Sequence, residues 1–186
     1  MRGILLAAFL GLAVSAVASG VRAAELQPDN GQIFKLLELE GQLVRWSMPS
    51  KGLPAVVTYA FLTEPRDFPG ARNCDSMLPP EVALRNSEID AAAFRRETRA
   101  AFALWEDAAN LKFQEVPVAE AGILIGADAK NRGRAFTNVA LKAGTERGFG
   151  KIGQSLICLN PNRPWKIGFD GDLDVYDLRF TMAHEI

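Results

Sequence analysis

The sequence predicts an α/β (α+β) fold in which helices pack on a twisted sheet. Three observations predict it: a β-branched and aromatic segment at 55–61, a long amphipathic segment at 87–108, and several short apolar segments before a second helical pattern at 178–186. This order of strand, long helix, strands and helix is typical of a sheet layer covered by helices. With 186 residues, 48% hydrophobic and 23% charged, the chain fits one globular domain and is not disordered or collagen-like.

The N-terminus has the pattern of a secretory signal peptide. Arg2 precedes an apolar run at 4–18, and Val-Arg-Ala-Ala follows at 21–24; we therefore predict that residues 1–24 are a signal peptide. The alternative is a membrane-spanning helix, but the run is shorter than the roughly 20 residues that a bilayer requires. We expect a secreted or periplasmic (extracellular) monomer without a membrane anchor, in which an irregular lead-in at 25–44 precedes a domain at 45–186.

The first half of this domain is predicted as strand, loop and helix. The strand Ala55–Phe61 follows Gly52 and Pro54 and is β-branched and aromatic. Prolines and a glycine make 63–86 a long loop that contains Cys74. The segment 87–90, Ser-Glu-Ile-Asp, fits a capping box at the start of the long helix.

The second half is predicted as short strands and a final helix. Strands are expected at 111–114, 121–126, 135–140 and 156–160, and a glycine-rich segment at 144–153 separates the last two. At the C-terminus Leu178, Met182 and Ile186 have the spacing of one apolar helical stripe. No capping residue or basic last turn follows them, so we expect that the chain is cut short within this helix.

Cys74 and Cys158 are the only cysteines. In an oxidising compartment such a pair is most simply a disulfide, and a loop of this length would stabilise the fold by roughly 4–5 kcal/mol. The bond would also tether the long loop at 63–86. Free or metal-bound thiols are the alternative.

The charge balance and the histidine count limit the function. The chain has 21 basic and 22 acidic side chains and a net charge of -1, so nothing favours a nucleic-acid partner. Its one histidine, His184, excludes any site that needs several imidazoles from these residues alone. By itself the pair His184-Glu185 says little, because a lone histidine on a partly apolar helix is more often structural than a ligand.

Six segments of the sequence are informative when they are taken together. They are VTYAF at 57–61, AFALWEDAANLKFQEV at 101–116, AGILIGA at 121–127, GRAFTNV at 133–139, LICLNPNRPW at 156–165 and TMAHEI at 181–186. In their order and spacing they resemble the matrixins, the matrix-metalloprotease-like branch of the metzincins, and in particular the exported bacterial type. The resemblance runs from about residue 45 to the end. It implies a metzincin-like N-terminal subdomain, namely a twisted mixed sheet with a long helix and the start of the active-site helix.

The resemblance implies a zinc-dependent metalloendopeptidase. In that family the last segment opens the pattern H-E-x-x-H-x-x-G-x-x-H, which makes His184 the first zinc ligand and Glu185 the general base that takes a proton from zinc-bound water. The other two ligands would lie beyond Ile186, so we expect the 186-residue chain to be inactive alone. The substrate would be a protein or peptide that lies along an edge strand by β-augmentation. That strand would be Ala135, Phe136, Thr137, Asn138 and Val139.

The resemblance also concerns structural ions. Arg134 and Cys158 stand where it would place structural zinc ligands, and Asn160 stands where it would place a calcium-binding aspartate. We therefore expect no structural zinc, with the disulfide as its substitute; metal binding through Cys158 is the alternative. Calcium stays open for the acidic run at 170–174. There the EF-hand spacing fails because Val175 replaces the required glycine, and a solvated turn leading into the last helix is the competing interpretation.

A second class of function is a secreted non-catalytic binding or adhesion protein that retains a matrixin-like fold. The presence of both His184 and Glu185 favours the enzyme, because a protein that had lost its chemistry would be free to lose either residue. A purely structural periplasmic domain is a third interpretation.

Overall fold

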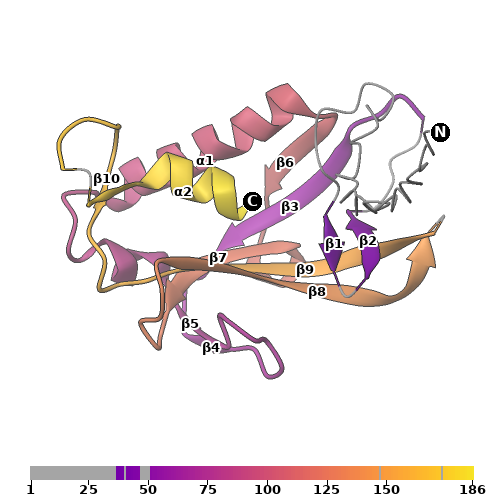
Figure 1. The fold of residues 1–186 in the computed structure, drawn as a ribbon, viewed down its shortest axis with the longest axis horizontal. Coiled ribbons are helices and arrows are strands. Elements are labelled where there is room, and N and C mark those ends of the chain that lie inside the picture. Colours follow the sequence, from indigo (N-terminus) through magenta and orange to yellow (C-terminus); the bar gives the residue numbers. More distant parts are fainter. Residues whose placement is uncertain (1–36, 40, 47–50, 147, 173) are drawn as a thin grey trace, which may run out of the picture. The chain divides into compact units, whose positions relative to one another are not determined.

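The computed structural model describes residues 37–39, 41–46, 51–146, 148–172 and 174–186. These residues form a nine-stranded mixed sheet, a small two-stranded sheet and two α-helices (Figure 1), which confirms the predicted α+β class. The predicted signal peptide, 1–24, and the lead-in as far as residue 36 lie outside the described residues. Across the described part of the chain, no helix is both long and apolar enough to cross a membrane.

The sheet has a parallel centre and one long antiparallel strand at its edge. Its order is β1-β2-β9-β7-β3-β6, and β8 pairs with β9 on the other side of that strand. β3 is parallel to β6 and β7, β7 is parallel to β9, and β8 is antiparallel to β9. The strands are β1 (Glu38–Leu39), β2 (Gln42–Arg45), β3 (Ala55–Phe61), β4 (Arg66–Asp67), β5 (Ser76–Leu78), β6 (Leu111–Glu115), β7 (Ile123–Asp128), β8 (Ala135–Glu146), β9 (Phe149–Leu159), β10 (Trp165–Lys166) and β11 (Tyr176–Asp177).

Helix α1 (Ala91–Ala108) starts three residues later than a capping box at Ser87 would place it. Asp90 is the N-cap, because its carboxylate accepts a hydrogen bond from the amide of Ala93 at 2.7 Å. Ser87 instead accepts a hydrogen bond from the amide of Trp165 at 2.7 Å. The predicted cap was therefore wrong, since a strand distant in sequence takes the serine hydroxyl.

The glycine-rich segment at 144–153 does not separate two short strands. It lies within a long hairpin, in which β8 and β9 run well beyond the predicted 135–140 and 156–160. Gly144 and Gly148 have positive φ angles of 85° and 81°, which glycine adopts without strain. Gly153 lies inside β9, where a Cβ atom would come within 2.8 Å of the Lys142 side chain. These glycines permit the hairpin rather than interrupt it.

Two segments predicted as irregular contain regular structure. The end of the lead-in forms the antiparallel pair β1 and β2, and β2 joins β9 in parallel. The loop at 63–86 contains β4, β5 and the 3-10 helix η1 (Pro80–Leu84). A second 3-10 helix, η2 (Val118–Glu120), follows β6. These strands are too short to give a periodic pattern, and the strands that connect them to the sheet, β9 for β2 and β7 for β5, lie far away in sequence.

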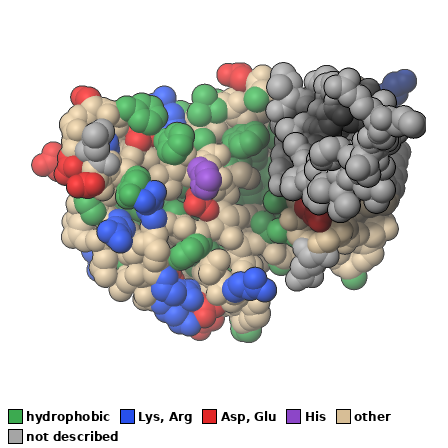
Figure 2. Space-filling model, in the orientation of Figure 1, with side chains coloured by type: hydrophobic (Ala, Val, Ile, Leu, Met, Phe, Trp, Pro, Cys, Tyr) green, Lys and Arg blue, Asp and Glu red, His purple; other side chains and the backbone are tan. Residues whose placement is uncertain are grey.

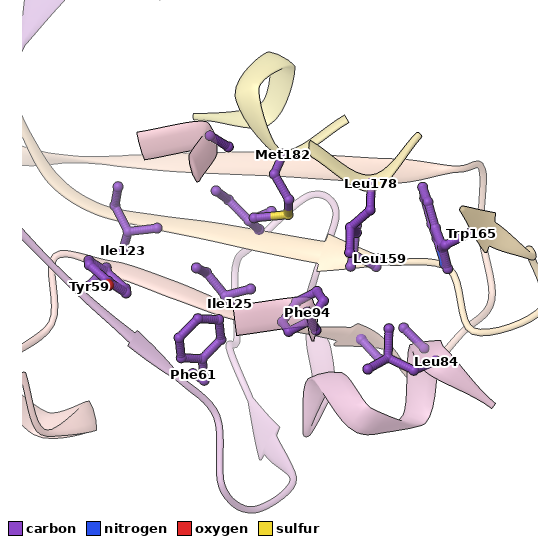
Figure 3. Packing of buried hydrophobic residues seen from close by; sticks show 14 of the residues in the cluster. Tyr59, Phe61, Leu84, Phe94, Ile123, Ile125, Leu159, Trp165, Leu178 and Met182 are labelled. Atoms are coloured by element: carbon purple, nitrogen blue, oxygen red, sulfur yellow. The ribbon is translucent and has the colours of Figure 1, made fainter. Parts of the chain in front are cut away.

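The two faces of the sheet are covered differently. Helices α1 and α2 (Leu178–Glu185) cover one face, whereas β4 and β5 lie on the other side (Figure 1). Under the helices, Phe94 of α1 and Met182 of α2 meet Ile125 of β7 in the main hydrophobic core (Figure 3). A smaller cluster that contains Leu62, Met77 and Leu156 lies on the opposite face. The odd and even residues of β9 serve different clusters, as strand alternation requires.

The predicted disulfide is confirmed. Cys74 and Cys158 are bonded, with their Cα atoms 5.7 Å apart and both side chains fully buried. The alternative of free or metal-bound thiols was therefore wrong. The bond joins the loop between β4 and β5 to β9, on the face opposite the helices.

Candidate functional site

Helix α2 carries the candidate residues and begins as the sequence predicts. The carboxylate of Asp177 accepts a hydrogen bond from the amide of Phe180 at 2.7 Å and caps the N-terminus. Leu178 and Met182 are fully buried, and Ile186 packs against the same core. The predicted stripe is therefore the buried face of α2, which fixes the rotation of the helix above the sheet (Figure 3).

Two polar contacts attach α2 to α1. Arg179 Nε and Nη2 donate to Oε2 of Glu97 at 2.8 and 2.6 Å, and Glu97 is only 2% exposed. Near the other end of α2, Trp105 Nε1 donates to the carbonyl oxygen of Ala183 at 2.9 Å. This second bond connects the turn that carries His184 and Glu185 to α1.

His184 lies on the surface, and Glu185 is half-buried beside it. The one histidine of the chain is visible among exposed side chains on this face of the molecule (Figure 2). Leu104 and Phe180, which are 53% and 63% exposed, also belong to the outer surfaces of the two helices. The imidazole of His184 is therefore accessible to a ligand from solvent.

Glu185 contacts the edge strand β8 at Thr137. The Thr137 hydroxyl lies 2.6 Å from Oε2 of Glu185 and 2.7 Å from its main-chain carbonyl oxygen. The structure thus brings together two residues that the sequence analysis assigned to separate parts of the site, the general base and the substrate strand. They are 48 positions apart in the chain.

β8 presents one free edge in the described part of the structure, because β9 is its only strand partner there. The amide of Asn160 donates to the carbonyl of Arg134 at 2.9 Å. In this antiparallel register the backbone amides and carbonyls of the even-numbered residues from 134 to 140 are therefore directed at β9. The backbone groups of Ala135, Thr137 and Val139 consequently point to the free edge. All three belong to the predicted substrate strand.

The opposite edge of the sheet, formed by β6, is partly blocked. Glu106 at the end of α1 accepts a hydrogen bond from the amide of Phe113 at 2.7 Å, and Lys112 donates to the same carboxylate at 3.0 Å. These two bonds lower the pKa of Glu106 below its ordinary value, the backbone bond most of all. A charged side chain that caps an edge amide discourages strand addition, so β8 is the more open of the two edges.

A groove of about 840 Å³ lies against the face of β8 that points away from the helices. It is lined by the loop at 66–73, by β8 at 137–141 and by β1. The Asn138 side chain fastens the loop, because its Oδ1 accepts hydrogen bonds from the amides of Arg72 and Asn73 at 2.8 and 3.4 Å. Since Thr137 and Asn138 point to opposite faces, the groove and Glu185 lie on different sides of the strand.

The three positions that the resemblance relates to structural ions are used otherwise. Arg134 stacks on the ring of Tyr176, 3.1 Å from its centroid, and donates to the Tyr176 hydroxyl. Asn160 is buried and donates to the carbonyls of Asn131 and Gly133 at 3.1 and 2.7 Å. Cys158 is in the disulfide. Each side chain is thus already engaged with a protein partner.

Two residues of the acidic run, Asp170 and Asp172, bind a lysine ammonium group through their main-chain carbonyls. Lys166 Nζ donates to the carbonyl oxygens of Asp170 and Asp172 at 2.8 and 2.5 Å. A positive side chain thus occupies the place where two carbonyl oxygens converge. Asp177, at the end of the following segment, caps α2, which agrees with the interpretation of this segment as a turn leading into the helix.

The described residues do not fit a catalytic zinc ion by themselves. A catalytic zinc site uses three protein ligands and an open position for water, whereas no group of three or more histidine, cysteine, aspartate or glutamate side chains in the described part of the chain could hold a metal ion. His184 offers one imidazole, and the Glu185 carboxylate is engaged by Thr137. A catalytic zinc ion here would need further ligands from outside the described residues.

No protein-family model matches the chain, and a search of curated proteins finds no match. The fold is therefore established by the structure, and the function rests on the site. Sequence reasoning missed the roles of Arg179, Trp105 and Thr137 in holding α2. Their partners Glu97, Ala183 and Glu185 lie between 48 and 82 positions away, so no local pattern could have indicated them.

Proposed function

We propose that this protein is an exported metalloendopeptidase of matrixin type, whose general base is Glu185 and whose first zinc ligand is His184. The observation that carries the proposal is the position of Glu185 against Thr137 of β8, at 2.6 Å. A hydrolase of extended peptides needs its base next to the strand that receives the peptide. Here the only glutamate on α2 is in that place.

The residues of this chain would perform three tasks. The free edge of β8 would bind an extended peptide through the backbone groups of Ala135, Thr137 and Val139, as in strand addition. Glu185 would take a proton from the attacking water as a general base. The exposed imidazole of His184 would provide one ligand to a zinc ion, which supplies electrophilic activation when bound.

The proposal requires two further zinc ligands from outside these residues, since His184 is the only histidine. The coding sequence after Ile186 tests this directly. We expect histidine codons four and ten positions after that of His184, with a glycine between them. A stop codon at that point, or a downstream sequence without this histidine pair, would refute the peptidase.

The enzymatic test uses the complete product of the gene and a mixture of internally quenched peptides. Glu185→Gln should lower kcat by roughly 10²- to 10⁴-fold, because it removes the proton acceptor. Glu88→Gln is the matched control, since Glu88 is an exposed glutamate distant in sequence from α2; its rate should equal that of the wild type. Equal rates for Glu185→Gln and the wild type would exclude Glu185 as the base.

A non-catalytic peptide-binding protein is the second candidate. The observation that favours it is the open edge of β8 in the described part of the structure, because strand addition needs only the backbone groups of that edge. Such a protein would bind extended peptides without cleaving them. Mass spectrometry of peptides incubated with the complete protein and zinc separates the two functions, because only the peptidase yields cleaved products.

A further inference from the structure

The geometry points to Thr137 as the positioning residue that holds the Glu185 carboxylate for catalysis; this inference rests on the proposed function. Thr137 lies on β8, and its hydroxyl is within hydrogen-bond distance of both Oε2 and the carbonyl oxygen of Glu185, at 2.6 and 2.7 Å. Thr137 belongs to the predicted substrate strand through its backbone. Its side chain has a separate task.

The first step of the argument concerns the freedom of the glutamate side chain. A glutamate has three rotatable bonds, and ordering them costs side-chain entropy. General-base catalysis requires the carboxylate to stay within hydrogen-bond reach of the attacking water. In the described structure the Thr137 hydroxyl is the side-chain group that meets this carboxylate. Without it, Glu185 would sample several rotamers at the surface.

The second step concerns the main chain of residue 185. The Thr137 hydroxyl lies within hydrogen-bond distance of the Glu185 carbonyl oxygen as well as of its carboxylate. A hydroxyl has one proton, so it donates to either oxygen at a given moment. In both cases it fixes residue 185 relative to the strand that would bind the substrate.

The third step separates the side chain of Thr137 from its backbone. Strand alternation directs the Thr137 side chain to α2, while its backbone amide and carbonyl point along the sheet to the free edge. Thr137→Val therefore removes the hydroxyl and keeps both the shape of the side chain and the backbone groups that would meet a peptide. The inference predicts a loss in kcat with an unchanged KM.

The experiment compares variants of the complete gene product. Thr137→Val should lower kcat by about 10- to 100-fold, in the range that small misplacements of a catalytic group produce. Thr137→Ser keeps a hydroxyl and should recover most of the rate. Thr145→Val is the matched control, because Thr145 is an exposed threonine on the same strand; its kcat should not change. Thermal unfolding of each variant verifies that it is folded.

The outcomes distinguish the two proposals. If Glu185→Gln hydrolyses peptides as fast as the wild type, the proposed function fails. If Glu185→Gln is inactive but Thr137→Val retains full kcat, or loses it without recovery in Thr137→Ser, the positioning role fails.

A second measurement does not depend on activity. Side-chain scalar couplings of Glu185, measured by NMR, should report one rotamer in the wild type and in Thr137→Ser, and rotamer averaging in Thr137→Val. A single rotamer in Thr137→Val would overturn the inference even if no hydrolysis were detected in any variant.

Discussion

Arg179 of α2 and Glu97 of α1 form an ion pair in which one partner is buried and the other is half exposed. Two guanidinium nitrogens of Arg179 contact Oε2 of Glu97 at 2.8 and 2.6 Å, and the side chains are 47% and 3% exposed. Arg96 approaches the other carboxylate oxygen at 3.4 Å. Because Glu97 has lost its contact with water, its negative charge depends on these two arginines for stabilisation.

This difference in burial predicts how the stability changes when Arg179 alone, or both partners, are replaced. Removing one partner of a buried pair costs roughly 3–5 kcal/mol. We expect about 2 kcal/mol for Arg179→Met, because Arg179 is half exposed and Arg96 remains nearby. In Glu97→Met/Arg179→Met no buried charge is left alone, so the double variant should be more stable than Arg179→Met. Urea unfolding of the wild type, the two single variants and the double variant gives the coupling free energy between Arg179 and Glu97. A double variant less stable than Arg179→Met would contradict this account.

The disulfide gives a second prediction. Cys74 and Cys158 are 84 positions apart, and closing a loop of this length should stabilise the fold by about 4 kcal/mol, within a range of 0–5 kcal/mol for measured disulfides. Cys74→Ala/Cys158→Ala should show this loss in urea unfolding without a change in secondary structure by circular dichroism. Alanine is the suitable replacement because both side chains are fully buried.

A thiol titration in denaturant provides the control. The unreduced wild type should show no reactive thiol, and the reduced protein should show both of its cysteines. Reactive thiols in the unreduced protein would contradict the bond.

The disulfide and the ion pair show how much of the structure could be predicted from the sequence. The disulfide was predicted from the number of cysteines and the predicted compartment, and the buried face of α2 from the spacing of Leu178 and Met182. Each depends on a local pattern or a simple count. The ion pair between Arg179 and Glu97 depends on how α2 rests on α1, and nothing in the neighbouring residues indicates it.

The same distinction explains the errors in the strands. Gly150 and Gly153 looked like breaks, but both lie inside β9, where added Cβ atoms would crowd Gln42 and Lys142. These positions suit glycine because side chains of the neighbouring strands occupy the space that a Cβ atom would need. The candidate site shows the same limit: the sequence indicated Glu185 and Thr137 separately, and the fold brought them into contact.

The third prediction concerns pH and the buried carboxylate of Asp128. Burial alone would raise the pKa of Asp128. The side chain of Arg132, together with the amides of Arg132 and Lys130, outweighs burial and lowers the pKa below its ordinary 3.8. Arg132 also joins Asp75 at 2.7 Å, and Lys130 and Arg132 lower the pKa of Asp75. The cluster connects the end of β7 to the loop that carries the disulfide.

The lowered pKa values determine the direction in which the stability changes with pH. A carboxyl group with a lowered pKa in the folded state adds stability above its ordinary pKa of 3.8 and loses it as the pH falls through the folded value. Wild-type stability should therefore decrease below about pH 4. Asp128→Asn should be less stable by about 2 kcal/mol at pH 7, because the amide opposes the donors around it.

Urea unfolding between pH 2 and 7 tests this. The loss between the two ends of the range should be smaller in Asp128→Asn than in the wild type. Asp107→Asn, at an exposed position of α1, is the control and should follow the wild-type curve. If Asp128→Asn and the wild type lose equal stability on acidification, Asp128 is not responsible for the loss of stability at low pH.

The last prediction separates the two backbone faces of β8. The amide of Val139 points to the free edge, whereas the amide of Asn138 belongs to the ladder with β9. Proline has no amide hydrogen and is tolerated on an edge strand where that hydrogen would face solvent. We therefore expect Val139→Pro to remain folded and lose less than about 1.5 kcal/mol of stability. Asn138→Pro should lose more, because it removes a hydrogen bond of the ladder with β9. Because Val139→Pro removes one donor that an added strand would use, it should also bind an extended fluorescent peptide more weakly, by about fivefold or more in Kd. Val139→Ala retains the amide and should bind like the wild type in the same anisotropy titration. Equal affinity for Val139→Pro and Val139→Ala would show that peptides do not add to this edge of the sheet.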